Sequence, residues 1–197
     1  MARPSRAEEQ RARVLAASVE IFGTRGFRAT SMNEIAAGVG LSKPTLYHYF
    51  RNKEDLLVRI YSDVLDESLR MALATVAAAP TGIDGLRELL ISRVVYTCEH
   101  RELLKICFEE EDELRPELAE ELLVRRRRFE DVVQSALEQH LAAHPDVQLG
   151  MSATVFVNMC LGAVNWTYKW YRPDGPRTPV ELGTEIAGAL LAGITPT

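Results

Sequence analysis

The hydrophobic positions of this chain recur every three or four residues, which places them along one face of a helix. No segment alternates apolar and polar residues as a half-buried strand does, and no Asn-Gly hairpin turn occurs. We therefore predict an all-α fold, with helices over residues 7–22, 31–39, 42–49, 53–79, 84–99, 102–113, 116–141, 147–168 and 179–194.

Helix signals at fixed offsets are concentrated between residues 31 and 50. Ser31 and Glu34 form a capping box, in which hydroxyl and carboxylate satisfy backbone N–H groups left free at a helix start. Gly40 allows the positive φ of a tight turn, and Ser42 is a good N-cap for a second helix that has Pro44 in its first turn. Two short helices joined in this way predict a helix-turn-helix that binds DNA.

The second helix of this motif has an inward face formed by Leu46, Tyr49 and Phe50. Its outward face carries a cation, a proline and two aromatic rings, at Lys43, Pro44, Tyr47 and His48. Cations and hydroxyls reach phosphates, while Pro and Tyr edges pack on thymine methyl groups, so this face suits the major groove of DNA. An ordinary αα-corner without a DNA contact is the alternative.

The same stretch resembles the signature of the tetracycline-repressor (TetR) family of one-component regulators. The match covers roughly the first third of the chain and lies at Phe27, Thr30, Ile35, Ala36, Gly40, Ser42, Thr45, Leu46, Tyr47, Tyr49, Phe50, Lys53 and Leu56. The resemblance implies an N-terminal three-helix DNA-binding domain in residues 1–52. A C-terminal helical bundle for effector binding and dimerisation would occupy residues 53–197.

The resemblance also implies roles for single residues in a DNA complex. Lys43, Pro44 and Tyr47 would face base edges. Phosphate contacts would come from Thr30, Thr45, His48, Tyr49 and Lys53. The expected DNA-binding set also includes the cap residues Ser31 and Ser42. Because Lys43 and His48 occupy positions that vary within the family, the operator sequence does not follow from the resemblance.

Composition indicates an ordinary globular protein whose charge is unevenly divided. The 197 residues are 47% hydrophobic and 26% charged, with a net charge of −5. Residues 1–53 hold nine Lys/Arg against four Asp/Glu, and the remainder is acidic. A local basic patch is enough to attract phosphate, so the acidic total does not exclude DNA. A basic arm at residues 1–6, with Arg3 and Arg6, could add a contact, or could be a frayed terminus.

Three cysteines, Cys98, Cys107 and Cys160, are an odd number without CxxC spacing, and the amino terminus has no signal-peptide core. We therefore expect a cytoplasmic protein with buried thiols. A metal site at Cys98, His100 and Cys107 is the alternative, but this spacing fits no common zinc pattern. We expect neither a metal nor a cofactor.

The predicted helix from residue 53 to residue 79 is the expected mechanical link. Its first turn holds Lys53 and its body enters the acidic half, so a displacement of the body would move the DNA-reading end; a plain connector helix is the alternative. The run from Arg125 to Arg128 points four ways on a helix. We expect it to pair with the acidic run at residues 109–113 rather than to bind nucleic acid.

Residues 147–168 contain no charged side chain across 22 positions, which is long enough to span a bilayer. Polar residues within the segment and the lack of flanking cations in the preceding sequence argue against a membrane span. A helix apolar on several faces is instead expected between subunits. With the last helix it should form a four-helix bundle in a homodimer. Close approach would be allowed by the small residues Gly183, Gly188, Ala189, Ala192 and Gly193.

Helical bundles bind ligands between helices, in apolar pockets with a few polar anchors. Candidate ligand-binding residues, each of which could equally be core or interface, are Tyr96, His100, Phe108, Phe129, Asn158, Asn165, Trp166 and Trp170. The segment NWTYKWYRPDGP, followed by TPVEL, resembles TetR members that govern lipid or aromatic-acid breakdown. We expect a largely apolar effector, such as an acyl-CoA or another acyl thioester.

These features together predict a homodimeric TetR-type repressor that binds a palindromic double-stranded DNA operator and is released by a small molecule. No GxGxxG, GxSxG or P-loop motif occurs and the four histidines are scattered, so we do not expect an enzyme. The rival interpretations are a helical-bundle enzyme or binding module, and a regulator without a small-molecule effector. An operator-binding assay separates these classes.

Overall fold

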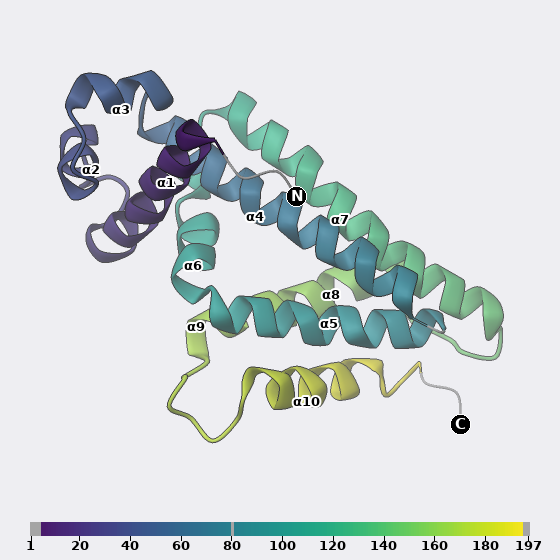
Figure 1. Cartoon of the computed structure of the whole chain (residues 1–197). Helices are drawn as coiled ribbons and strands as arrows, with labels where there is room; N and C mark the ends of the chain where they lie inside the picture. The colour runs from purple at the N-terminus through teal and green to yellow at the C-terminus, as the bar shows by residue number, and fades with distance from the viewer. Residues whose placement is uncertain (1–4, 80, 195–197) are drawn as a thin grey trace. The chain divides into compact units, whose positions relative to one another are not determined.

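The computed structural model describes residues 5–79 and 81–194, and every regular element within them is a helix (Figure 1). The first elements are α1 (Arg6–Arg25), α2 (Met32–Gly38), α3 (Lys43–Tyr49) and α4 (Lys53–Ala78). They are followed by α5 (Gly82–Glu99), α6 (Arg101–Glu109), the 3-10 helix η1 (Glu111–Glu113), α7 (Pro116–Ala143), α8 (Ala153–Asn165), α9 (Thr167–Trp170) and α10 (Pro179–Leu191). The predicted all-α fold is confirmed.

Some helix ends differ from the prediction for local reasons. Helix α1 begins at Arg6 because Ser5 and Glu8 form a capping box, so Arg6 is not part of an arm; Arg3 lies outside the described residues. The segment predicted as one helix over 147–168 begins only at Ala153, where Ser152 accepts the Val155 N–H. Within the described residues no helix is both long and apolar enough to cross a membrane.

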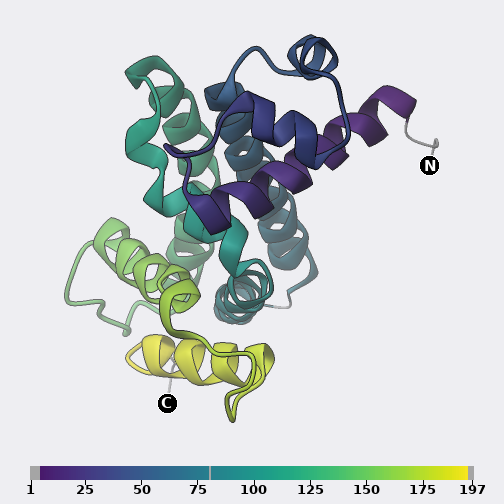
Figure 2. The same ribbon diagram turned by 90° about the vertical axis from the view of Figure 1, so that its left-hand side faces the viewer.

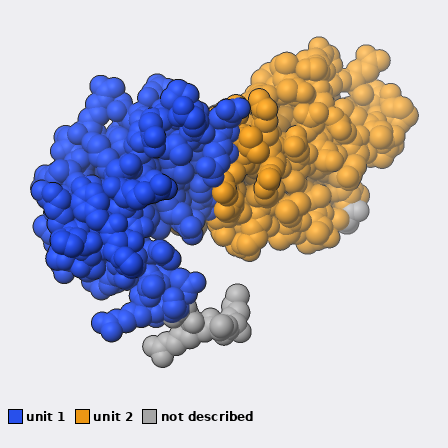
Figure 3. Space-filling view, turned by 90° about the horizontal axis from the view of Figure 1, so that it is seen from above, with its two compact units in different colours: residues 1–64, 102–122 blue, residues 65–101, 123–197 orange. Residues whose placement is uncertain are grey.

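The chain forms two compact units, drawn in separate colours in Figure 3. Unit 1 comprises residues 1–64 and 102–122, and unit 2 comprises residues 65–101 and 123–197. This grouping differs from the expected division after residue 52, because α4 and α7 each contribute to both units and α6 belongs with the N-terminal helices. A separation of DNA-binding and effector-binding functions at residues 52 and 53 stays a prediction.

In unit 1 the helix-turn-helix forms as its sequence signals predict. Ser31 and Ser42 cap α2 and α3, and Gly40 has a φ of 69° in the turn between them. Helix α2 packs against both α1 and α3. Fully buried apolar side chains such as Ile35 and Leu46 fill the space between these helices, which fixes the orientation of α3.

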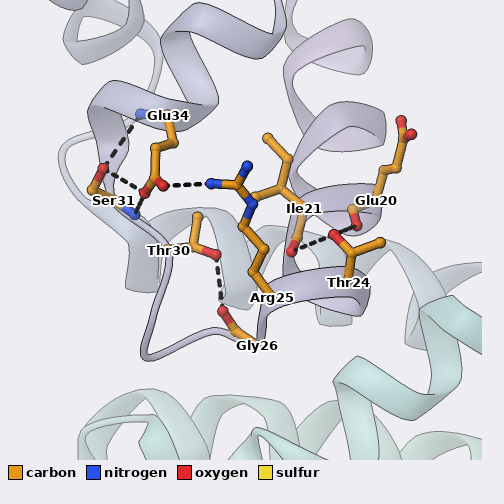
Figure 4. A network of polar contacts seen from close by, with 8 residues as sticks. All are labelled: Glu20, Ile21, Thr24, Arg25, Gly26, Thr30, Ser31 and Glu34. Carbon is orange, nitrogen blue, oxygen red and sulfur yellow. Dashed lines mark hydrogen bonds and ion pairs between the residues drawn. The ribbon is translucent and has the colours of Figure 1, made fainter.

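The turn between α1 and α2, residues 26–31, is held by polar contacts (Figure 4). The Thr30 hydroxyl donates to Gly26 O at 2.8 Å, and Arg25 pairs with Glu34 at 2.6 Å. From the first turn of α4, Lys53 Nζ donates to Phe27 O, Arg28 O and Thr30 O, at 2.9, 3.1 and 3.2 Å. All three ammonium N–H groups of Lys53 therefore have acceptors within the turn.

The acidic run after α6 binds the same turn. Glu110 accepts the Phe27 N–H at 3.3 Å, and Glu113 pairs with Arg28 at 2.6 Å. The hydrogen bond from Arg28 lowers the pKa of Glu113. We expected this acidic run to pair with the arginines of α7. The Arg125 guanidinium instead donates to Asp66 at 2.8 Å.

Unit 2 is organised around α5. Two of its residues per turn are buried, from Gly85 and Leu86 to Thr97 and Cys98, because α8, α9 and α10 all pack on it. Helix α10 lies against α5 in both ribbon views (Figures 1 and 2). A Cβ at Gly183 would lie 3.1 Å from Ile91 Cα, so this glycine permits close packing within the subunit and not, as expected, between subunits.

We predict that Lys53→Met lowers the free energy of unfolding by about 2 kcal/mol, because it removes charge-assisted hydrogen bonds to the turn. Arg59→Met is the matched control. It removes only the exposed Arg59–Asp63 ion pair and should cost less than about 0.5 kcal/mol. Denaturant unfolding of both variants measures the difference. Equal losses would show that Lys53 does not stabilise the turn.

Candidate functional site

The outward face of α3 is a compact polar and aromatic surface. Ser42, Lys43, Pro44, Thr45 and His48 are exposed. Tyr47 is also exposed, at 42%, and Lys43 Nζ lies 5.8 Å from the centre of its ring. The buried Leu46 on the opposite face anchors the helix and leaves these side chains free to meet another molecule.

Two hydroxyls at the start of α3 are linked. Ser42 Oγ accepts the Thr45 N–H at 3.3 Å and lies 2.7 Å from Thr45 Oγ1. Both residues remain exposed, so their hydroxyls can also donate to an incoming oxyanion. The beginning of α3 thus presents hydroxyls together with the Lys43 ammonium, the groups that commonly contact DNA phosphates.

Three other expected DNA-binding residues have their polar groups engaged within unit 1. Thr30 is only 3% exposed and its hydroxyl donates to Gly26 O. Lys53 donates to three backbone carbonyls, as described above. This geometry does not support the phosphate contacts expected for these two side chains. Ser31 is exposed, but its hydroxyl accepts the Glu34 N–H and donates to the Glu34 carboxylate at 2.8 Å.

Tyr49, at the end of α3, is half-buried between α1 and His48. The Arg11 guanidinium of α1 lies 5.8 Å from the centre of its ring, and the His48 ring is 5.4 Å away. Arg11 is a cation near the α3 surface that the sequence analysis did not single out. The position of Arg11 on the predicted first helix does not indicate that it lies near α3, because only the tertiary packing of α1 brings it to Tyr49.

A second candidate site is a narrow pocket within unit 2. It lies between α4, α5 and α7, and its walls are formed by Ser68, Met71, Ala72, Leu89, Ser92, Arg93, Tyr96 and Phe129. The free space is about 10 Å³, enough for roughly one water molecule. A larger ligand must therefore displace side chains from the wall.

The polar centre of this pocket is Arg93, which is only 8% exposed. Arg93 Nε donates to Asn165 Oδ1 at 2.7 Å, and NH1 donates to Ser68 Oγ at 2.8 Å. The guanidinium carbon lies 5.7 and 5.5 Å from the ring centres of Tyr96 and Phe129, within cation–π range. The sequence analysis missed Arg93, although a charged residue at a core position of a predicted helix is a signal that could have found it.

The expected ligand-binding residues divide into two groups. Tyr96 and Phe129 line the pocket, and Asn165 reaches it through Arg93. His100 is exposed, although its ring lies 4.4 Å from that of Tyr96.

The other expected residues do not join this pocket. Trp166 and Trp170 are 58% and 48% exposed, and the exposed Asn158 donates to Thr154 O at 2.8 Å. Phe108 belongs to unit 1. An apolar or amide residue on a helix does not reveal by itself which face of the helix it occupies.

Helix α8 also exposes a row of large apolar side chains. Val155, Met159 and Trp166 lie four and seven positions apart on its outward face, and each is about half exposed. Gly188 of α10 and its C-cap residue Ala192 are exposed, and a Cβ at Gly188 would meet no atom within 4 Å. An apolar face of this kind is typical of a protein–protein contact.

The three cysteines are buried, as predicted. Burial raises the pKa of Cys98, and it raises that of Cys160 to about 11, so both thiols are held in their neutral form. Among the described residues, no group of three His, Cys, Asp or Glu side chains is arranged to hold a metal ion.

Family models match both parts of the chain. Residues 14–60 match the model described as bacterial regulatory proteins, tetR family, and residues 79–194 match the tetracyclin repressor-like C-terminal domain. The HTH-type transcriptional repressor KstR2 of Mycolicibacterium smegmatis is 24% identical over 199 residues, covering 98% of this chain and 94% of that protein.

Solved structures have the same fold. The regulator PfmR from Thermus thermophilus has a TM-score of 0.82 at 24% identity, covering 93% of this chain and 99% of that chain. AibR, solved with isovaleryl coenzyme A and operator DNA, has a TM-score of 0.81 at 26% identity, covering 91% of this chain and 97% of that chain. Because the C-terminal model alone matches more than half of the chain, and an N-terminal model matches the helix-turn-helix, this protein belongs to the TetR family of transcriptional regulators.

Proposed function

We propose that this protein is a homodimeric, cytoplasmic repressor that binds a palindromic operator and is released by a small, largely apolar effector. The observation that carries the proposal is the exposed outward face of α3, where Lys43, Tyr47 and the hydroxyls of Ser42 and Thr45 are held together on a helix anchored by Leu46. A recognition helix of this kind fits the major groove.

The net negative charge of the chain is compatible with DNA binding. Attraction to phosphate depends on charges within about a Debye length, roughly 8–10 Å, so acidic residues farther than this from the α3 surface act weakly on it. Residues of the acidic run have partners inside unit 1: Glu110 with Phe27, Glu113 with Arg28, and Glu111 with Tyr61 OH at 3.4 Å.

The pocket around Arg93 supports a small-molecule effector. Its walls are apolar apart from Arg93, two serines and the Tyr96 hydroxyl, which is the composition of a typical ligand site. AibR is a relative solved with both isovaleryl coenzyme A and operator DNA, which makes an acyl-CoA or a related acid a reasonable first class of effector to test.

Helix α4 offers a route from the pocket to DNA. Its residues Ser68, Met71 and Ala72 line the pocket, and its first residue, Lys53, holds the turn before α2. A ligand that displaces the pocket wall would therefore act on the helix that fixes the helix-turn-helix. A 100-fold preference of the effector for the DNA-incompetent state corresponds to about 2.7 kcal/mol of coupling.

A second copy of the chain is the proposed partner for the exposed apolar face of α8 and the small residues of α10. Two helices from each copy would form a four-helix bundle that buries Val155, Met159 and Trp166. Two-fold symmetry would then place one α3 surface in each half of a palindromic site.

We predict that the protein selects an inverted repeat from random double-stranded DNA, with half-site centres about 34–36 Å or a multiple apart. Affinity should fall steeply with salt, because neutralised phosphates release counterions. Fluorescence anisotropy at several salt concentrations measures both effects. Adding acyl-CoAs, free fatty acids and aromatic acids to the complex then tests release.

A scrambled duplex of equal length serves as the control. Equal affinity for both duplexes would contradict the repressor assignment and favour a binding module or an enzyme. Release by none of the three ligand classes would favour a regulator without a small-molecule effector.

We predict that Tyr47→Ala and Lys43→Ala relax base preference, losing about 1–3 kcal/mol on the selected site and less on mismatched sites. Thr45→Val, which removes a proposed phosphate contact, should weaken all sites by a similar factor. Competition binding on half-sites with single base changes measures the preference. A uniform loss from Tyr47→Ala would mean that this ring does not face base edges.

We predict that Gly188→Leu weakens the dimer about 10- to 100-fold, because overpacking a close helix contact costs about 1–3 kcal/mol. Operator affinity should fall with it. A Cβ at this position would meet no atom of its own subunit within 4 Å, so the fold should be unchanged. Sedimentation measures the dimer, and Ala143→Leu, at an exposed position near the end of α7, is the matched control. An unaltered dimer in Gly188→Leu would place the interface elsewhere.

A further inference from the structure

We propose that the Arg93 guanidinium is the anchor for a carboxylate on the effector, so that the ligand of this pocket is an apolar organic acid. The inference deepens the proposed function and rests on it. It names the chemical group that the effector carries into the pocket and the side chain that selects it.

The position of Arg93 is the first reason. Arg93 is one of the residues that line the pocket, beside Met71, Ala72 and Leu89. Two hydrogen bonds and two aromatic rings orient it, at the distances given above. A buried, oriented cation on a residue that lines an otherwise apolar pocket can act as a receptor for an anion.

The chemistry of its contacts is the second reason. Asn165 Oδ1 and Ser68 Oγ are neutral acceptors, and a carboxylate forms hydrogen bonds with a guanidinium that are roughly twice as strong. A ligand carboxylate can therefore take over the contact that NH1 makes with Ser68. The Ser68 hydroxyl can then turn and donate to the second carboxylate oxygen.

The shape of the pocket sets the rest of the ligand. Since the free space holds roughly one water, the ligand body must displace part of the wall. Met71 is the most adaptable lining residue, because its unbranched side chain has three rotatable bonds. A body that replaces Met71 would lie against Leu89 and Phe129, so it must be apolar.

A carboxylate could come from two sources. One is a free acid, and the other is the far end of a dicarboxylic acid whose opposite end is a coenzyme A thioester. A simple acyl thioester has no carboxylate to offer Arg93. Calorimetric titration of the full-length protein without DNA should compare decanoate, methyl decanoate, decanoyl-CoA and the mono-CoA thioester of decanedioic acid.

If the effector is a free acid, the natural chain should bind decanoate at least about tenfold more tightly than methyl decanoate. If it is a dicarboxylic thioester, the chain should bind the mono-CoA thioester of decanedioic acid at least about tenfold more tightly than decanoyl-CoA. Arg93→Met should abolish this preference. Arg101→Met is the matched control, because Arg101 also donates to a neutral oxygen, Tyr168 O at 3.3 Å, but does not line the pocket. It should keep the preference.

Ser68→Asp provides a second test that retains Arg93 if Arg93→Met fails to fold, which circular dichroism would show. The introduced carboxylate lies where Ser68 Oγ now accepts from NH1, so it should occupy the guanidinium and exclude a ligand acid. Loss of acid binding with a retained thermal midpoint supports the inference. Unchanged acid binding by Ser68→Asp contradicts it.

The inference is overturned by equal binding of acid and ester by the natural chain, by a preference that persists in Arg93→Met, or by binding of none of the four ligands. Tighter binding of decanoyl-CoA than of decanoate, unaffected by Arg93→Met, would mean that the pocket accepts an acyl tail and would also overturn it. Operator release is measured separately. If the protein binds acids through Arg93 but does not bind DNA, only the proposed function is contradicted. If ligands release DNA independently of Arg93, only this inference is contradicted.

Discussion

The hydrogen bonds from Lys53 to the turn between α1 and α2 are the interaction on which the DNA-reading surface depends. A cation at the first residue of a helix is opposed by the helix dipole, so the position of Lys53 at the start of α4 requires compensation. Three backbone carbonyls provide it. Glu110 and Glu113 bind the same turn through an N–H and a guanidinium, so the entry to α2 is fixed by two elements that are distant in sequence.

The same requirement, that a cation within the fold has hydrogen-bond acceptors, applies to Arg93 in unit 2. Helix α5 is buried on a broad face, and in such surroundings an arginine would be costly without acceptors. Arg93 is retained among apolar residues because Asn165 and Ser68 accept its hydrogen bonds and two rings flank its guanidinium. A stable core could be built with an apolar residue at this position, which agrees with the proposed role of the guanidinium in recognition.

Helices α8 and α10 each carry apolar or small residues on a buried side and on an exposed side. Gly183 permits α10 to approach Ile91 of α5, whereas Gly188 faces open space. In the same way Phe156 is buried in the core of unit 2 and Trp166 is exposed. Sequence periodicity identifies that a helix has apolar residues on several sides, but the side that packs within the subunit depends on where the neighbouring helices lie.

The sequence by itself determined the all-α class, the helix-turn-helix, its caps at Ser31 and Ser42 and its turn at Gly40, because these signals act between residues three or four positions apart. The tertiary structure alone decided the hydrogen-bond partners of Lys53, Thr30 and Arg93 and the exposure of the tryptophans. Lys53 meets Phe27 across 26 residues and Arg93 meets Asn165 across 72. No local pattern encodes such pairs, since burial and hydrogen-bond partners are set by the packing of whole helices.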